Sequence, residues 1–551
     1  MRFSTPVARI RSQALQEQPV DGGTVDEWFV LSVKGREAVS SLYELELRLL
    51  TSHLFAAPYD SDRVDELFSS NYVVDMHQEV SEGADTPGGH DPVIAAMVHG
   101  YHGVLRELEM ENVARATPDL DGATPIVYRA VLVPRVWFLT QSVRTRLFQA
   151  MSVPEVLRHI LDELGLELDA DFEFRLLGKH LQREYLLQYD ESDWAFLSRL
   201  CEHEGIFFCF EQTQDREKLV FGDHNEGFQE FVTLAALAQS DDDTRFRHVR
   251  FDPRGGVLDS VPAIKRLTRR WRQVPRSVAV VDYDYKTPSA DVHAATEVYP
   301  AGLGQRVHYL EAKEYSAAGK ADDVAAQVAR LAPIRAASYL AERERLFAES
   351  AVLGLFAGMT FSLENHYDAD LVWLDEKADK RRRYIVIASE FSLVQEGIGD
   401  TGNLGFGASL TLQGHELAYR PPLATPRPVV AGGLSAKVAD RNNDPAADLD
   451  AQGQYALLLD IPTIGGGPAN GPTIKRFRMS QTFTGPAYGM HHPLHVGAEV
   501  LLVHLRGDPD RPVIAGSLPN FSNVPPVTAR NATHGGVRSR NGVVDYINDD
   551  A

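Results

Sequence analysis

Hydrophobic and polar residues alternate along much of the chain, and this pattern predicts strands. It is strictest at Leu42–Leu50, where Tyr43 and three leucines alternate with charged residues. A period of two places one face of a strand against a core and the other in water. Further strands are expected at Asp26–Val33, Val93–Leu105, Thr124–Pro134, Glu184–Gln188, Gly205–Glu211, Lys218–Gly222 and Tyr384–Val394. Short strands between turn residues indicate a mainly β protein built from closed or nearly closed antiparallel barrels.

Two regions outside these strands carry the residue pattern of a helix. Ser152 and Glu155 form a capping box before an apolar stripe that ends at Gly165, which predicts a helix with clear limits. The region Lys320–Ser350 is also helical in pattern. Pro333 lies inside it, and because proline lacks an N–H and clashes with the preceding turn, we expect it to break or kink this region into two helices.

A further helix is predicted at Asp190–Glu204, with acidic residues in its first turn. Trp194, Leu197 and Cys201 share one face of it, so we expect them to pack beneath a strand at Ile206–Phe210. The charged residues Glu202, His203 and Glu204 at its end are expected on the solvated side of an amphipathic helix.

Prolines divide the chain into a large and a small part. The segment 419–428 contains Pro421, Pro422, Pro426 and Pro428, which make it stiff and extended. We therefore predict a body at residues 1–415, a linker at 416–431, a compact barrel at 432–520 and a final segment at 521–551. Strands of the compact barrel are expected at Tyr455–Ile461, Arg476–Gln481, Glu499–Leu505 and Pro512–Leu518. The final segment is polar and too short to bury a face of its own, so it is either a disordered tail or the start of a structure that other chains complete.

The charge of the chain excludes one class of partner. The 551 residues carry a formal net charge of −22, whereas a nucleic-acid binder needs lysine and arginine to neutralise phosphates. Cys201 and Cys209 are the two cysteines, and they are expected to be small core residues rather than part of a disulfide framework. No apolar run of the kind found in a signal peptide follows Met1, which predicts a protein made and folded in the cytoplasm.

A search for catalytic and binding motifs gives weak candidates. Gly397, Gly399 and Gly402 spell G-x-G-x-x-G, but more glycine and a strand-like pattern follow, so a hairpin loop is the better interpretation than a dinucleotide site. His491, His492 and His495 could ligate a metal, yet they lie in a loop, and surface or packing roles are favoured. His90, His99 and His102 do not share a face and are not expected to form a site. We therefore predict no catalytic, cofactor-binding or metal-binding residue.

Several stretches resemble one protein family. Residues 183–211 (REYLLQYDESDWAFLSRLCEHEGIFFCFE) closely resemble the signature of the VgrG family, the spike proteins of type VI secretion systems. Residues 35–51 and 97–107 are similar to early strands of that family, and residues 488–520 to its OB-fold region. Residues 531–539 resemble the place where the family's needle begins.

The resemblance implies a fold and a function. The fold would be a phage hub-like N-terminal region with two barrel-like domains and inserted helices, then an OB-fold and the start of a triple-stranded β-helix. The protein would be a homotrimer that caps the hexameric Hcp tube, contacts baseplate proteins and carries effectors, their adaptors or a PAAR-type tip. It would be assembled in the cytoplasm, leave the cell by type VI secretion without a signal peptide, and puncture target membranes without catalysis.

Two further expectations accompany this resemblance. Because residues 531–550 leave their backbone donors and acceptors unpaired, we expect them to be disordered in a single chain and ordered only when three copies pair edge to edge. The alternative function is the tail hub of a phage or of another contractile injection system with peptidoglycan-hydrolase activity. In such hubs the hydrolase is an extra domain between the OB-fold and the needle, where residues 521–528 leave room for a short linker only.

Overall fold

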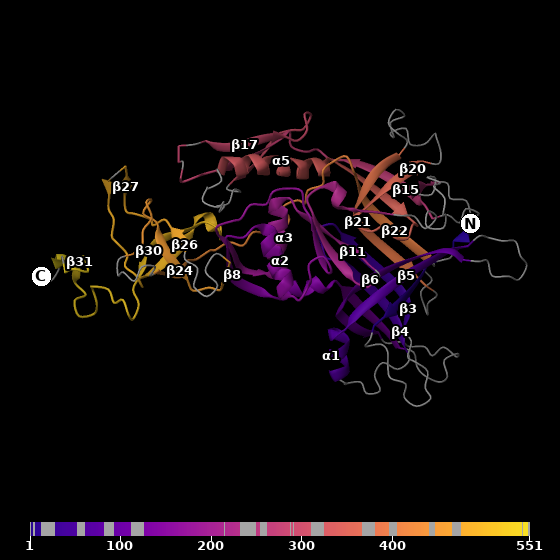
Figure 1. Cartoon of the computed structure of the whole chain (residues 1–551), viewed down its shortest axis with the longest axis horizontal. Coiled ribbons are helices and arrows are strands. Elements are labelled where there is room, and N and C mark those ends of the chain that lie inside the picture. The colour runs from indigo at the N-terminus through magenta and orange to yellow at the C-terminus, as the bar shows by residue number, and fades with distance from the viewer. Residues whose placement is uncertain are drawn as a thin grey trace, which may run out of the picture.

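The computed structural model has an elongated mainly β architecture, which confirms the predicted fold class (Figure 1). The structure describes residues 2–3, 6–12, 28–51, 61–81, 93–111, 126–213, 215–231, 249–253, 262–286, 288–289, 291–309, 324–365, 381–395, 405–439, 447–465, 475–486, 488–542 and 544–548. Among these residues, no helix is both long enough and apolar enough to cross a bilayer.

The first large barrel is formed by the N-terminal strands. Its hydrogen-bonded order is β2 (Val7–Arg11), β5 (Asn71–Ser81), β6 (Val93–Glu111), β7 (Ile126–Val133), β4 (Glu44–Thr51) and β3 (Phe29–Ala38). Strand β1 (Arg2–Phe3) also pairs with β5, and helix α1 (Ser61–Ser69) precedes β5. Tyr43, Leu45, Leu47 and Leu49 are all buried, as their alternation predicts.

The second large barrel closes on itself. Its order is β21 (Arg381–Val394), β22 (Gly405–Gly414), β19 (Glu344–Ser350), β15 (Ile264–Trp271), β14 (Val249–Phe251) and β20 (Met359–Asn365), and β20 pairs again with β21. The short β13 (Gln229–Glu230) pairs in parallel with the start of β20. Strands β21 and β22 form the hairpin expected around the glycine-rich segment, whose Gly397, Gly399 and Gly402 lie outside the described residues.

The two large barrels share one continuous sheet, because β3 of the first pairs with β21 of the second. At this seam Gly35 lies opposite Phe391. A Cβ at position 35 would lie 2.1 Å from the Phe391 ring, so the close approach requires glycine. A single core cluster then runs from Leu45 and Leu47 of the first barrel to Leu410 of the second.

A unit with two helices follows the first barrel. It contains η2 (Arg135–Thr140), β8 (Val143–Gln149), α2 (Val153–Glu163), β9 (Phe172–Arg175), β10 (Leu186–Ser192), α3 (Asp193–Glu204), β11 (Phe207–Gln212), β12 (Glu217–Gly222) and η3 (Asn225–Gly227). The predicted capping box is present at α2, where Glu155 accepts a hydrogen bond of 2.7 Å from the Ser152 backbone N–H. Helix α3 ends at Gly205, which adopts the left-handed conformation with φ of 72°.

A second unit is inserted between β15 and β19. It consists of β16 (Ser277–Asp282), β17 (Val292–Glu297), β18 (Gln305–Tyr309) and α5 (Val324–Arg343). The predicted break at Pro333 is wrong, because α5 continues through it. Val328, Leu331 and Ala336 are buried against the strands on either side of the proline, and this packing outweighs the lost hydrogen bond. The helical prediction for residues 344–350 is also wrong, since they form β19.

The C-terminal strands form a small barrel, ordered β26 (Lys475–Phe477), β24 (Tyr455–Leu459), β23 (Leu434–Val438), β29 (Glu499–His504) and β30 (Pro512–Leu518). The barrel closes because Ser480 N donates to Ile514 O at 2.8 Å, and Ile514 N donates to Arg478 O at 2.9 Å. Its other elements are β25 (Thr463–Gly465), β27 (Thr484–Gly485), β28 (Tyr488–Gly489) and η5 (Leu505–Gly507).

The expectation that the final segment stays unpaired in a single chain is wrong. Strands β31 (His534–Arg538) and β32 (Val544–Asn548) pair with each other as an antiparallel hairpin. The hairpin satisfies the backbone groups between its strands, yet residues 535–542 are exposed. β31 lies at the end of the molecule opposite the two large barrels (Figure 1).

We predict that Gly35→Ala destabilises the protein by about 1–3 kcal/mol, because the added methyl group overpacks the Phe391 ring at the seam. Gly407→Ala in β22 is the matched control, since no heavy atom lies within 4 Å of the Cβ it would add. Chemical denaturation of the two variants provides the comparison. Equal stability of both would contradict the close packing of the seam.

Candidate functional site

Helix α3 packs as predicted on one side but is not amphipathic. Leu197 and Cys201 are fully buried with Phe208, and the half-buried Trp194 meets the Phe208 ring edge-on at 5.2 Å. The expectation that Glu202, His203 and Glu204 lie in water is wrong, because all three are buried. Burying charged groups costs free energy unless partners are supplied, so this end of α3 is the candidate functional site.

Glu204 lies in a buried ionic cluster. Its carboxylate accepts a hydrogen bond from Arg183, and Arg330 Nη1 of α5 lies 3.0 Å from its Oε2. Burial alone would raise the pKa of Glu204, but Arg183 and Arg330, together with hydrogen bonds from His180 and His203, lower it well below its usual value. The carboxylate therefore stays charged, and its partners come from two separate units of the fold.

His180 bridges two carboxylates in this cluster. Its Nδ1 lies 3.4 Å from Glu204 and its Nε2 lies 3.6 Å from Asp223. Burial would lower the pKa of His180, but hydrogen bonds to Asp223 and Glu204 raise it above the usual value. The Asp223 carboxylate also accepts hydrogen bonds from the backbone N–H groups of Leu177, at 2.9 Å, and Gly178, at 2.6 Å. His180 therefore ties the loop after β9 to the end of α3.

Glu202 lies two residues before Glu204 in α3. It holds the backbone of residues 419–428, which we call the proline-rich segment. Its carboxylate accepts hydrogen bonds from the N–H groups of Ala424 and Thr425, both at 2.9 Å, and from the Thr425 hydroxyl at 2.6 Å. Tyr419 is buried at the start of the same segment. The segment is therefore packed against α3 rather than being a free connection.

Two arginines donate hydrogen bonds to the last carbonyls of α3, where the helix runs out of N–H donors of its own. Arg335 of α5 donates to Glu202 O at 3.3 Å and to His203 O at 3.0 Å. Arg420 of the proline-rich segment donates to Gly205 O at 2.9 Å. The end of α3 thus joins the α5 unit and the proline-rich segment through its backbone as well as its side chains.

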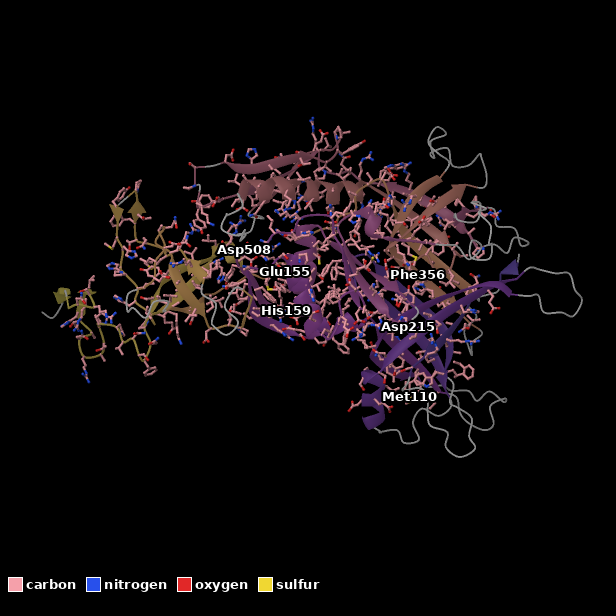
Figure 2. All side chains as sticks on the ribbon, viewed as in Figure 1. Met110, Glu155, His159, Asp215, Phe356 and Asp508 are labelled. Atoms are coloured by element: carbon pink, nitrogen blue, oxygen red, sulfur yellow. The ribbon has the colours of Figure 1, made fainter. Side chains whose placement is uncertain are left out.

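The small barrel is attached to the same region. Asp510 accepts a hydrogen bond of 2.9 Å from the Leu187 N–H of β10, and Asp508 accepts one of 3.1 Å from Arg427. Figure 2 shows Asp508 where the small barrel meets the α2–α3 unit. Arg511 contacts Asp282 of β16 at 2.9 Å.

Apolar side chains continue across this junction. Leu147 and Leu187 lie in the same buried cluster as Tyr455 and Ile514 of the small barrel. Strand β25, which follows β24 of the small barrel, pairs in parallel with β8. A shared core, shared backbone pairing and paired charges therefore fix the small barrel to the body of the molecule.

Comparison with models of known protein families gives a match to this chain. The model of the phage tail baseplate hub (GPD) family matches residues 36–397. The chain belongs to this hub family. The match begins in β3 and ends just after β21, so it covers most of both large barrels and the two inserted units.

Relatives of this hub protein include spike proteins. It is 26% identical over 535 residues to the type VI secretion system spike protein VgrG1c of Pseudomonas aeruginosa, an alignment that covers 92% of this chain and 62% of the relative. The chain thus spans about six tenths of the length of curated relatives such as this one.

Two solved structures share the fold of the hub protein. An E. coli protein, described as a component of the type VI secretion system similar to the T4 tail proteins gp27 and gp5, matches with a TM-score of 0.57 and 20% identity. The match covers 93% of this chain and 100% of that one. A structure of the Francisella PdpA–VgrG complex matches with a TM-score of 0.57 and 7% identity, over 100% of this chain and 83% of that one.

The histidines considered from the sequence have other surroundings in the hub protein. His491 lies 3.1 Å from the Tyr455 hydroxyl and 3.0 Å from Gln481 Nε2, so both of its ring nitrogens are engaged. His99 stacks on Phe356 with ring centroids 3.9 Å apart, and His90 lies outside the described residues. Within the ranges that the structure describes, no three His, Cys, Asp or Glu side chains gather as metal ligands do.

We predict that His180 contributes stability that depends on pH. Because its pKa is raised in the folded protein, this contribution is fully present below about pH 6.5, the usual histidine pKa, and is lost as the pH rises through the raised value. The melting temperatures of the wild type and of His180→Gln should therefore differ most at low pH and converge at high pH. A difference that stays constant between about pH 6 and pH 9 would show that His180 does not carry the bridging proton.

Proposed function

We propose that the protein is the structural spike of a type VI secretion system and works by transmitting axial force. The observation that carries the proposal is the junction around α3, where Glu202 binds the proline-rich segment, Glu204 binds the α5 unit, and Asp510 of the small barrel binds the backbone of β10. A puncturing device needs its wide base and its tip to move as one body. The spike proteins among its relatives support this assignment.

In this proposal the protein acts without catalysis. The buried carboxylates and histidines at the α3 junction are engaged with cations and backbone N–H groups, which is an arrangement for holding elements together. The proposal also includes assembly in the cytoplasm and export through the secretion system.

We further propose the domain boundaries and partners that the sequence predicts. Residues 1–415 would form the hub, 416–431 the linker, 432–520 an OB-fold and 521–551 the start of a triple-stranded β-helix. The closed five-stranded barrel supports the OB-fold, and the exposed β31–β32 hairpin supports a role in joining copies. The assembly would be a homotrimer that caps the Hcp tube, contacts baseplate proteins and carries effectors, their adaptors or a PAAR-type tip.

This function can be tested by measuring the mass of the protein in solution and its binding to Hcp hexamers. We expect light scattering to give a mass of three chains, and purified Hcp hexamers to bind the trimer in a ratio of one hexamer to three chains. A monomer that does not bind Hcp would contradict the proposal. Loss of turbidity when the protein is added to purified cell wall would instead favour a hydrolytic hub.

A further inference from the structure

The small barrel has an outer face that a single chain leaves uncovered. In an antiparallel barrel, strands should bury one face and expose polar residues on the other. Strand β29 buries Val500 and Leu502, but its opposite face carries Leu501 and Val503, and Leu505 follows in η5. Val503 is 36% exposed and Leu505 is 42% exposed.

Neighbouring residues extend this face. Val513 of β30 pairs directly with Val503, and Val429, which is 65% exposed, lies beside the turn at Gly507. We call Val429, Leu501, Val503, Leu505 and Val513 the flat patch. These five side chains are uncharged, and two charged residues border them, Glu499 at the start of the same face of β29 and the exposed Arg506 after Leu505.

The same barrel also presents a protruding apolar hairpin. Strands β27 and β28 pair through Gly485 and Tyr488, and Met490 N donates to Phe483 O at 3.1 Å. Phe483, Tyr488 and Met490 are exposed to 52%, 65% and 42%. Figure 1 shows this hairpin projecting from the barrel. Its backbone is already paired, so docking it would cost little ordering entropy.

The occupant of the flat patch follows from charge and symmetry. Copies of a chain with net charge −22 repel one another, so contacts between them are favoured over surfaces that lack charge. Around a threefold axis, each contact joins two different faces of neighbouring copies. The small barrel offers two such faces, one flat and one protruding, and both are apolar.

We propose that the hairpin of one copy, through Phe483, Tyr488 and Met490, packs on the flat patch of the next copy and so closes a ring of three small barrels. This inference rests on the proposed homotrimer and adds the surfaces through which its copies meet. It assigns a role to side chains that neither the body of the molecule nor the ionic junction uses.

The first test places a charge on each face of the full chain. Val503→Glu and Tyr488→Glu each alter an exposed side chain, so folding should be retained, which circular dichroism checks. Both variants should shift from three chains to one by light scattering, whereas Gln452→Glu, in an exposed turn of the same barrel, should remain trimeric. If the wild type is trimeric and both variants are too, this inference is overturned while the proposed function stands. A wild type that is not trimeric would overturn both.

A second test does not depend on weakening the assembly. The native Cys201 and Cys209 are buried, so introduced surface cysteines should react selectively. The double variant Tyr488→Cys with Val503→Cys should form disulfides between chains on mild oxidation, giving dimer and trimer bands without reductant. The control pair His293→Cys with Val503→Cys uses an exposed position on β17 and should give at least tenfold less. Equal cross-linking in both pairs, or none in either, would contradict the contact.

Discussion

The charged end of α3 is buried, and the rest of the architecture depends on supplying it with partners. A buried carboxylate that loses its partner costs about 3–5 kcal/mol, so each partner is held firmly in place. Glu204 is paired with Arg183 and Arg330, while Glu202 accepts hydrogen bonds from the backbone N–H groups of Ala424 and Thr425. These groups belong to the α2–α3 unit, the α5 unit and the proline-rich segment, which therefore cannot separate without exposing an unpaired charge.

This constraint explains how a molecule of several barrels can behave as one body. The large barrels are joined by backbone pairing between β3 and β21, and the small barrel is joined by a shared core and by the bond from Leu187 to Asp510. A connection of this kind resists both bending and twisting, because polar and apolar contacts would have to break together. Such stiffness suits a spike, whereas an enzyme with moving lids needs parts that can move relative to one another.

Local patterns in the sequence were sufficient to predict much of the fold. The alternation around Tyr43 and Leu45, and the capping box at Ser152 and Glu155, depend on neighbours within a few residues. The junction could not be found in this way, since Ala424, which donates to Glu202, and Arg335, which donates to His203 O, lie more than one hundred residues away along the chain. Pro333 was misjudged because the packing of α5 against distant strands overrode a local rule. The β31–β32 hairpin has a different origin, since its two strands are close in sequence and pair with each other.

Hydrogen exchange at the proline-rich segment tests the central claim most directly. If Glu202 anchors this segment, the amides of Ala424 and Thr425 should exchange as slowly as those of a buried strand. In Glu202→Gln, these two amides should exchange faster while the amides of β21 stay unchanged. Rapid exchange of both amides in the wild-type protein would contradict the account, because Glu202 would then not hold the proline-rich segment against α3.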